Sequence, residues 1–276
     1  APPGVSFKIG LVYHYCCNVL TYMKLFLRKH QNSFFLISIY LILICALLTR
    51  IYNLPERINL GSDHSRDAII AMEALRRHEL PLIGSFASAG PFVFGPLYYW
   101  YVMCAYILMP FTHKAPWILM TFMGVLTVAV MMRSGYLIGG KRLCIVIGLL
   151  TAFAPQFIAR STFLSQHSLV GITSALTVLF FILLYQRKKL YFSFLTGLSL
   201  GAALSMHYQA INLLIFLPAI FLIPKISIRK KILHALVFLL GVLIPSLPLL
   251  YWDSKQGFAN INNVLDYIFV AQYRVY

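Results

Sequence analysis

Long apolar runs separated by short polar segments dominate this chain. A run of roughly 20 apolar residues can cross a bilayer as a helix. The polar residues Ser205, His207 and Gln209 divide the region 190–223, which is too long for one crossing, into two short helices. The candidate helices are residues 33–50, 95–111, 116–138, 143–159, 168–185, 190–206, 208–223 and 232–250. This pattern predicts an all-α protein folded as a polytopic bundle of membrane helices.

Composition supports a membrane protein, because 60% of the residues are hydrophobic and only 11% are charged. In a soluble domain, about half of the residues are hydrophobic and about a quarter are charged. The net charge of +16 would suggest nucleic acid in a soluble chain, but the 23 basic residues are scattered between apolar runs and therefore indicate topology. We expect no nucleic-acid partner. The cysteines form neither a disulfide framework nor a metal-ligand spacing, and they are Cys16, Cys17, Cys45, Cys104 and Cys144.

The distribution of charge predicts which loops are cytoplasmic. Three loops contain nine basic residues and no acid, which is typical of cytoplasmic loops. These loops are residues 141–142, 187–189 and 225–231. All seven acidic residues fall within 51–94 and 251–276, which are therefore expected outside. Because Arg28 and Lys29 are also expected inside, a single crossing must separate residues 51–94 from Lys141.

Only one of the two runs 95–111 and 116–138 can then cross the membrane. The first is rich in interfacial aromatic residues, and no lysine or arginine separates it from the acidic region before it, so we expect it to lie along the outer surface. Its marker residues are Pro96, Tyr98, Tyr99, Trp100, Tyr101 and Tyr106. About seven transmembrane helices remain. The alternative is a true hairpin at 95–138, which would invert every later loop and place the nine cations outside.

These positions divide the chain into three parts. Residues 1–22, which precede Met23 and a short basic stretch, are interpreted as an extension outside the conserved module. Residues 23–250 form the seven-span module, and its first external loop, residues 51–115, contains juxtamembrane helices. Residues 251–276 begin a second external segment, and the polar, aromatic ending suggests a truncated chain.

A capped helix is predicted at residues 62–75 of the first external loop. Its apolar side consists of Ile69, Met72 and Leu75. Asp63, at the start of this helix, can be an N-cap that accepts backbone N–H bonds and pairs with Arg66 one turn later. It can also be a functional carboxylate, held at a helix N-terminus beside a cation at the membrane surface. The two interpretations are compatible.

The motifs of this loop resemble those of a known family. Asp63 is followed one turn later by Arg66, then by a Pro-Leu-x-Gly turn at residues 81–84 and by Gly-Pro-Leu-Tyr-Tyr at residues 95–99. This order is similar to that of the GT-C superfamily of polyprenyl-phosphate-sugar-dependent glycosyltransferases. The similarity is greatest to bacterial members related to protein mannosyltransferases and lipid A aminoarabinose transferases.

The resemblance continues beyond the loop but is not complete. Arg160 follows Ala154-Pro155 as at the end of the family's third span, and His207-Tyr208 matches a short external turn found in many members. Residues 161–167 differ, because related bacterial members often have an aromatic-Asn-Pro-Asn stretch or a second acid there. The family's second acid therefore has no counterpart at these positions.

The resemblance implies transfer of a sugar from a polyprenyl-phosphate donor to a lipid, glycan or protein acceptor, at the outer face of a bacterial inner membrane and usually with inversion. Asp63 would orient and deprotonate the acceptor, and Arg66 would bind the phosphate through its planar fork. Arg160, His167 and His207, which are all expected on the outer side, would also bind the donor. Nothing in the sequence requires a divalent metal ion, and we expect no cofactor besides the lipid-linked donor substrate.

Each of these side chains also has a simpler explanation. Arg160 at an outer helix end can extend to lipid headgroups, and His167 or His207 at a turn can cap a helix. A different class of protein, a non-enzymatic transporter or flippase of lipid-linked sugars, would be favoured by ionisable residues or broken helices at the middle of the bilayer. The charged residues of this chain lie mostly near helix ends and in loops, which favours transfer at the surface.

Overall fold

The computed structural model describes residues 32–58 and 61–271, so the predicted extension at residues 1–22 lies outside the described residues. Within these ranges the regular structure is helical, apart from one isolated bridge between Phe86 and Val93. Four helices are long and apolar enough to cross a membrane, judged by length and composition. They are Asn32–Ile51, α5 (Ala115–Phe153), α7 (Gln166–Arg187) and α10 (Ile228–Lys255). The protein is therefore an all-α membrane protein, as predicted.

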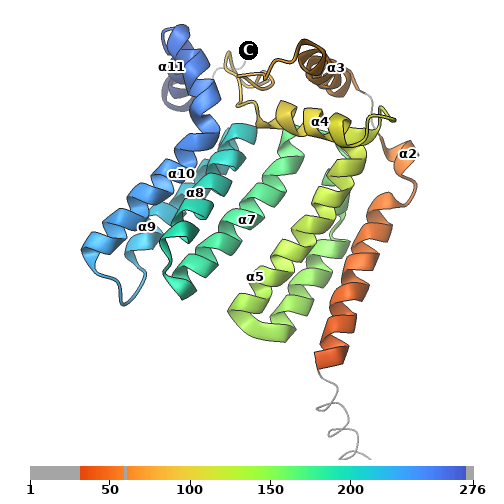
Figure 1. Ribbon diagram of the computed structural model, residues 1–276, viewed down its shortest axis with the longest axis vertical. Coiled ribbons are helices and arrows are strands. Elements are labelled where there is room, and N and C mark those ends of the chain that lie inside the picture. Colours follow the sequence, from red (N-terminus) through yellow and green to blue (C-terminus); the bar gives the residue numbers. More distant parts are fainter. Residues whose placement is uncertain (1–31, 59–60, 272–276) are drawn as a thin grey trace, which may run out of the picture.

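The remaining helices are shorter, and some of them are too polar to cross a membrane. The apolar ones are α4 (Leu97–Leu108), α8 (Leu190–Met206), and η1 (Tyr208–Ile215) with α9 (Phe216–Phe221). The others are α2 (Leu54–Arg57), α3 (Ser62–Arg77), α6 (Pro155–Arg160), α11 (Ala259–Asp266) and the π-helical turn η2 (Tyr267–Ala271). Figure 1 shows the long helices and α8 running side by side, with α3, α4 and α11 at one end of the bundle.

α5 reverses its direction partway along. Gly139 and Gly140 have non-helical backbone angles, and Gly140 (φ 67°, ψ −156°) occupies a region that glycine alone adopts readily. Figure 1 shows the chain turning back, so that α5 consists of two antiparallel arms. A Cβ atom on Gly148 would touch Met132 in the other arm, because the arms pack closely. The break predicted before residue 143 is thus a tight turn.

Two predicted helices differ from the observed ones. The helix predicted at 143–159 is interrupted, because the second arm of α5 ends at Phe153 and α6 begins at Pro155. Proline disfavours helical angles in the residue before it, and that residue is extended here. The helix predicted at 208–223 forms as the 3₁₀ helix η1 followed by α9. Its first turn is tightened by His207, whose side chain accepts a hydrogen bond from the backbone N–H of Gln209.

α8 and α10 pack against one another through small residues. A Cβ atom on Gly197 would collide with the carbonyl group of Phe238, so glycine is required for this close approach. The Ser193 hydroxyl and His234 Nδ1 lie 2.6 Å apart across the same interface. Buried side chains around it form an apolar core of Leu184, Phe192, Leu200, Ile220, Ile223 and Phe238. α8 and α10 are therefore closely packed along this interface.

α4 lies across the end of the bundle rather than alongside the long helices (Figure 1). It contacts α3, α5 and α8, and its 12 residues are fewer than a crossing needs. Tyr98 and Tyr99 are buried against core residues that include Trp117 and Met120. These tyrosines were expected to anchor the helix at the lipid interface, but they anchor it by packing on the bundle. The surface position predicted for 95–111 fits this geometry.

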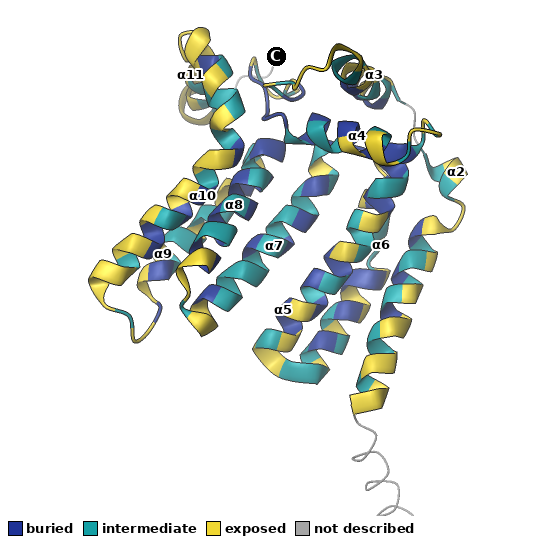
Figure 2. Cartoon of the chain, in the orientation of Figure 1, coloured by how far each residue is buried: buried dark blue, intermediate teal, exposed yellow. Residues whose placement is uncertain are grey.

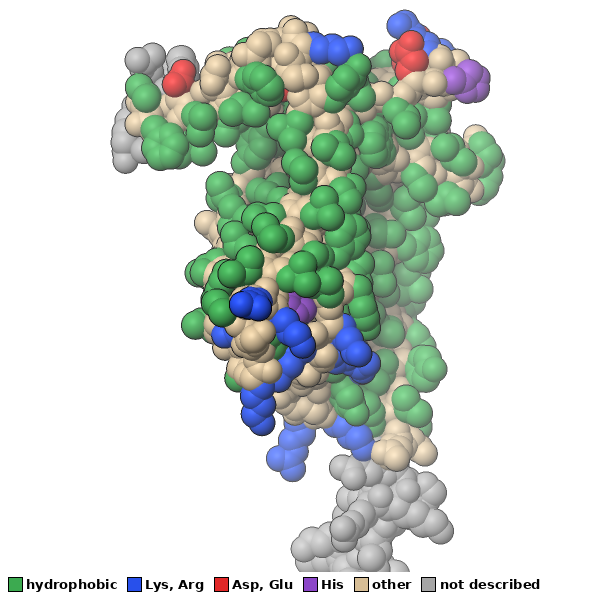
Figure 3. All heavy atoms as spheres, turned by 60° about the vertical axis from the view of Figure 1, so that its left-hand side comes forward, with side chains coloured by type: hydrophobic (Ala, Val, Ile, Leu, Met, Phe, Trp, Pro, Cys, Tyr) green, Lys and Arg blue, Asp and Glu red, His purple; other side chains and the backbone are tan. Residues whose placement is uncertain are grey.

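The outer surface of the bundle is apolar in its middle and charged at its ends. In Figure 2 the outward faces of the long helices are exposed, and on α10 these faces carry leucines. The exposed leucines of α10 are Leu233, Leu236, Leu239, Leu240, Leu243 and Leu247. Figure 3 shows a broad apolar belt, with lysine and arginine gathered at the end opposite α3 and α4. An exposed apolar belt of this kind is the surface that lipid covers.

Candidate functional site

A cavity of about 880 Å³ lies at the end of the bundle that carries α3 and α4. Five chain segments that are distant in sequence form its walls: α3, the loop 85–94, the turn 163–167, the junction of α8 with η1, and the C-terminal residues 264–268. Its polar lining includes Asp63, His64, Arg66, Asp67, Ser85, Ser165, Gln166, His167, His207 and Gln209. The structure therefore brings Asp63, Arg66, His167 and His207 together, as the sequence predicted, whereas Arg160 lines an adjoining pocket.

Two glycines of the sequence motifs fix the loop that forms one wall. A Cβ atom on Gly84 would collide with the carbonyl oxygen of Gly95, and a Cβ atom on Gly95 would collide with the Ser205 hydroxyl at the end of α8. Backbone hydrogen bonds accompany these approaches, from Gly84 N to Phe94 O (2.8 Å) and from Gly95 N to Ser205 O (2.9 Å). The Pro-Leu-x-Gly and Gly-Pro-Leu-Tyr-Tyr motifs therefore hold this loop against the bundle.

A second network joins the C-terminal segment to the same loop. Asp253 is fully buried and accepts hydrogen bonds from the backbone N–H groups of Asn260 (2.7 Å) and Ile261 (3.0 Å), at the start of α11. Asn260 Oδ1 in turn accepts from Val93 N (2.8 Å), and the Tyr208 hydroxyl donates to Val93 O (2.7 Å). Asp253 thus acts through α11 to set the cavity wall, a role that the sequence analysis missed.

The predicted apolar side of α3, with Ile69, Met72 and Leu75, is mostly exposed. Ile69 and Met72 are exposed, and the buried residues of α3 are His64, Asp67 and Ala71. The hydrophobic period points to one face, but α3 packs on α4 through another face, where polar groups pair with each other. Leu75 alone of the expected set packs against the core.

Asp63 is not the N-cap of α3, which corrects one of its two interpretations. The N-cap is Gly61, and Asp63 lies within the first turn with its side chain 76% exposed. The predicted pair with Arg66 is confirmed, with Arg66 Nη1 3.0 Å from Asp63 Oδ1. A negatively charged side chain in the first turn interacts favourably with the helix dipole, so this position of α3 suits a carboxylate.

Arg66 also binds a second carboxylate, Asp67, that the sequence analysis did not single out. Arg66 Nη2 and Nε donate to Asp67 Oδ1 at 2.9 and 3.1 Å, and the Tyr99 hydroxyl donates to the same oxygen at 3.3 Å. Burial raises the pKa of Asp67, and the hydrogen bonds and charge of Arg66 oppose that rise. Asp63 and Asp67 are four residues apart, about one helical turn, and Arg66 lies between them. This spacing was the signal in the sequence that could have identified Asp67 as a second partner of Arg66.

The rings of His167 and His207 contact one another in the cavity wall at a tilt of 42°. Their centroids are 4.2 Å apart, and His207 stacks on Phe94 at 4.8 Å. Burial, and then the neighbouring His167, lower the pKa of His207 to about 4. At neutral pH His207 is therefore uncharged. Its Nδ1 accepts from Gln209 N (3.2 Å), which leaves the proton on Nε2 as a hydrogen-bond donor.

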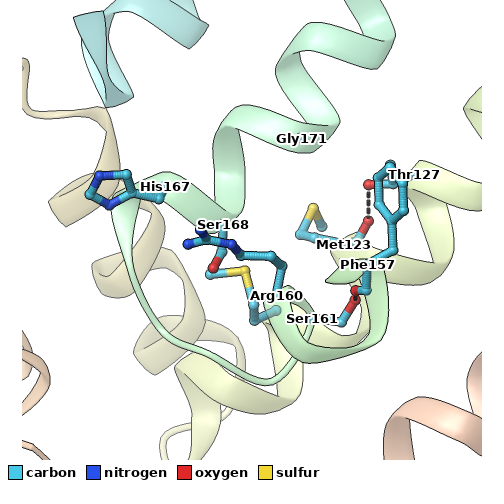
Figure 4. Close-up of a pocket in the computed structure, with 10 residues that line it drawn as sticks. Met123, Thr127, Phe157, Arg160, Ser161, His167, Ser168 and Gly171 are labelled. Atoms are coloured by element: carbon cyan, nitrogen blue, oxygen red, sulfur yellow. Dashed lines mark hydrogen bonds between the residues drawn. The ribbon is translucent and has the colours of Figure 1, made fainter. Parts of the chain in front are cut away.

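Arg160 lies in a small pocket of about 80 Å³ that shares His167 with the large cavity. Figure 4 shows its guanidinium extending from α6 towards Ser168 in the first turn of α7. Within the described residues no carboxylate lies within 4 Å of Arg160, whereas Arg66 has two. Arg160 therefore brings a positive charge to the site without an acid to neutralise it.

The structure also bears on two other features, a possible metal site and the buried Arg50. Among residues 32–58 and 61–271, no three His, Cys, Asp or Glu side chains lie close enough together to hold a metal ion. Arg50, which is buried at the end of the first helix, donates to the carbonyl groups of Ala46, Thr151 and Ala152 and so links that helix to the end of α5.

No protein-family model matches the chain, and no curated protein matches it at a significant level.

Proposed function

We propose that this protein is a membrane glycosyltransferase of the GT-C type, which moves a sugar from a polyprenyl-phosphate donor to an acceptor at the extracytoplasmic face. The observation that carries the proposal is the cavity at one end of an apolar bundle, whose lining includes Asp63, Arg66, His167 and His207. Its volume of about 880 Å³ is within the usual range for binding sites, roughly 300–1,000 Å³. The family resemblance of the loop motifs supports the same function.

The proposed topology has seven crossings. They are the helix Asn32–Ile51, the two arms of α5, α7, α8, the pair η1 and α9, and α10. α4 would then lie on the outer surface of the membrane, beneath α3. The basic end of the bundle would face the cytoplasm, because lysine and arginine accumulate on that side of membrane proteins. The cavity would face outward, at the acidic end.

Asp63 would act on the acceptor. The acceptor oxygen attacks the anomeric carbon, the bond between that carbon and the phosphate oxygen breaks, and the phosphate leaves with the electron pair. The acceptor hydroxyl gives its proton to Asp63, whose side chain is the more exposed of the two carboxylates beside Arg66. A phosphate is already a good leaving group, so the demand on the protein is for a base and for charges that stabilise the phosphate.

Arg160, His167 and His207 would hold the donor phosphate. Arg160 has no acid within 4 Å in the described residues, so its charge is available to an anion. His207 offers an N–H donor without a charge of its own. Arg66, the first choice from sequence, uses three N–H groups on Asp63 and Asp67 and would contribute through the others.

The apolar part of the cavity would hold the start of the lipid chain. The donor combines a charged phosphate with an apolar polyprenyl chain, and the cavity lining has the same two parts. Its apolar residues include Phe92, Leu204, Ile211, Val264 and Ile268. Ile211 is about half exposed in η1, one of the proposed crossings, so the cavity extends from the polar site towards the lipid-facing surface.

Product formation by purified protein in nanodiscs tests the proposal. Polyprenyl phosphates that carry different sugars would be supplied with labelled acceptors, and release of free polyprenyl phosphate would be measured together with acceptor labelling. We expect both products to appear in equal amounts. No product from a broad panel, combined with sugar movement across sealed vesicles that contain the protein, would replace the transferase by a transporter of lipid-linked sugars.

A further inference from the structure

Three charged side chains of α3 line the cavity and differ strongly in how far they are buried. Asp67 is 3% exposed, while the side chains of Arg66 and Asp63 are 45% and 76% exposed. Arg66 bridges the two acids, with Nε and Nη2 on Asp67 Oδ1 and Nη1 on Asp63 Oδ1. The exposed acid of the lining is thus connected to the buried acid through one guanidinium.

From this juxtaposition we propose that Asp67 is a positioning residue, which fixes the Arg66 guanidinium and through it aims Asp63 into the cavity. The proposal rests on the proposed function where it concerns sugar transfer. It assigns no contact between Asp67 and the substrate. The alternative is that Asp67 only neutralises Arg66 and contributes to folding, without any effect on how Asp63 is oriented.

The attachment of Asp67 to α4 explains why it can act as an anchor. The Tyr99 hydroxyl donates to Asp67 Oδ1, and Tyr99 is itself only 4% exposed in the helix that lies across the bundle. A buried side chain has little freedom to change its rotamer, so the oxygen that receives Arg66 has a defined place. A guanidinium with two donors on one fixed oxygen is held more firmly than one with a single exposed partner.

Glu73 on the same helix shows what an ordinary surface pair looks like. It accepts from Arg77 Nε at 2.8 Å and lies 3.9 Å from Arg76, but its side chain is 45% exposed and it does not line the cavity. Exposed pairs of this kind contribute little and leave their arginines mobile. Glu73 therefore provides a matched control, with the same helix, a carboxylate, and arginine partners.

The anchoring can be measured without any assay of activity. In the full chain labelled with ¹⁵N-arginine, the side-chain signals of Arg66 are assigned by their loss in Arg66→Lys. We expect restricted rotation of the Arg66 guanidinium in the wild type and in Glu73→Gln, and free rotation in Asp67→Asn. An Arg66 signal that stays restricted in Asp67→Asn would overturn the proposal.

Kinetics then test the consequence for transfer. A positioning role predicts that Asp67→Asn lowers kcat by about 10-fold or more with little change in KM for the lipid donor, because small misplacements of a reacting group have large effects on rate. Glu73→Gln should keep wild-type values. Unchanged kcat in a folded Asp67→Asn protein would overturn the proposal, since a neutralising role alone affects stability.

A milder variant keeps the test decisive if Asp67→Asn does not fold. Tyr99→Phe removes only the hydroxyl that donates to Asp67, and it should increase the mobility of the Arg66 guanidinium and lower kcat by a few-fold. A Tyr99→Phe protein with unchanged Arg66 mobility and unchanged kcat would count against the proposal. Absence of transfer by the wild type would overturn the proposed function instead, and the mobility of Arg66 would still decide the anchoring.

Discussion

The charged residues at the two ends of the helix bundle differ in whether they form ion pairs. At the cavity end, all four ion pairs of the described residues lie on α3, and one of the acids involved is buried. At the other end, the basic residues form no ion pair with any acid in the described part of the chain. This basic end consists of Lys141, Arg142, Arg187, Lys188, Lys189, Lys225, Arg229, Lys230 and Lys231.

The difference follows from what each end has to do. Lys188 and Lys225 occupy tight turns with positive φ, and their charge needs only to lie in water or against lipid headgroups. Arg66 instead needs a defined direction, which requires partners from α3 and α4. At the basic end, what matters is the number of positive charges and the side of the membrane on which they lie. At the cavity end, what matters is the direction in which each charged side chain is held. Substitutions should therefore have unequal effects at the two ends.

The largest effect is expected at Asp63. If Asp63 accepts the proton of the acceptor, Asp63→Asn should lower turnover on the order of 100-fold or more. Asn preserves the size of the side chain, and Gly61 rather than Asp63 is the N-cap, so the helix should persist. Turnover would be measured in nanodiscs with the lipid donor, and insertion would be checked by monodispersity. Near-wild-type turnover would remove Asp63 from the catalytic role.

Arg66→Lys should have the next largest effect, a loss of turnover of about 10-fold, because lysine keeps the charge but cannot reach Asp63 and Asp67 together through a planar fork. Arg76→Lys is the control, since Arg76 is exposed and lies 3.9 Å from its partner. Equal turnover for the two variants would mean that only the positive charge of Arg66 matters, as at the basic end, and not the direction of its guanidinium.

Gly95→Ala tests whether close packing holds the cavity wall. The added Cβ would collide with the Ser205 hydroxyl, and overpacking of this kind costs about 1–3 kcal/mol. Gly171→Ala is the matched control, because no atom lies within 4 Å of an added Cβ there and alanine favours the helix. Thermal unfolding in detergent should separate the two variants. A stable Gly95→Ala protein would contradict the close approach of the loop to α8.

His207 predicts a pH dependence of stability. Its pKa is lowered to about 4 in the folded protein and is near 6.5 when unfolded, so the unfolded state binds more protons between these values. The contribution of His207 is complete above about pH 6.5 and decreases as the pH falls towards 4. His207→Gln should reduce the loss of thermal stability between pH 7 and pH 4.5. An identical pH dependence in both proteins would show that burial does not disfavour the charged imidazole.

The smallest effect on transfer is expected at the basic end. Lys188→Gln combined with Lys189→Gln should change turnover by less than about 2-fold, because exposed unpaired charges contribute little. The same region tests the topology more directly, through Lys188→Cys and a membrane-impermeant thiol reagent, with a variant that lacks the other cysteines as background. Labelling should require broken cells. Labelling of position 188 in intact cells would invert the proposed orientation of both ends.

Much of the helix plan could be predicted because bilayer thickness imposes a length on apolar runs. The run 33–50 corresponds to a helix from Asn32 to Ile51, and the run 168–185 to α7. The polar residues at 205–209 indicated the break after α8, and a glycine pair marks the turn within α5. The breaks at Pro155 and in η1 were missed, since apolar composition alone does not distinguish a continuous helix from an interrupted one.

The candidate site was only partly predictable. Asp63, Arg66 and His207 were recognised by motif and His167 by its expected place on the outer side, and all four line one cavity. Asp67 was missed because the apolar residues of α3 do not mark its buried face. In a segment that packs on other protein elements, the partner decides which face is buried, and here that partner is α4 with its buried Tyr99.

By itself the sequence determined that this is an all-α membrane protein whose charges divide between two kinds of loops, because hydropathy and the signs of side chains are properties of the chain. Only the tertiary structure decided which loop residues share a cavity. The segments that contribute Asp63, Val93, His167, His207 and Val264 meet through contacts between distant parts of the sequence. Such contacts depend on backbone approach and burial, as at Gly95 and Asp67, and no local pattern of hydrophobic and polar residues encodes them.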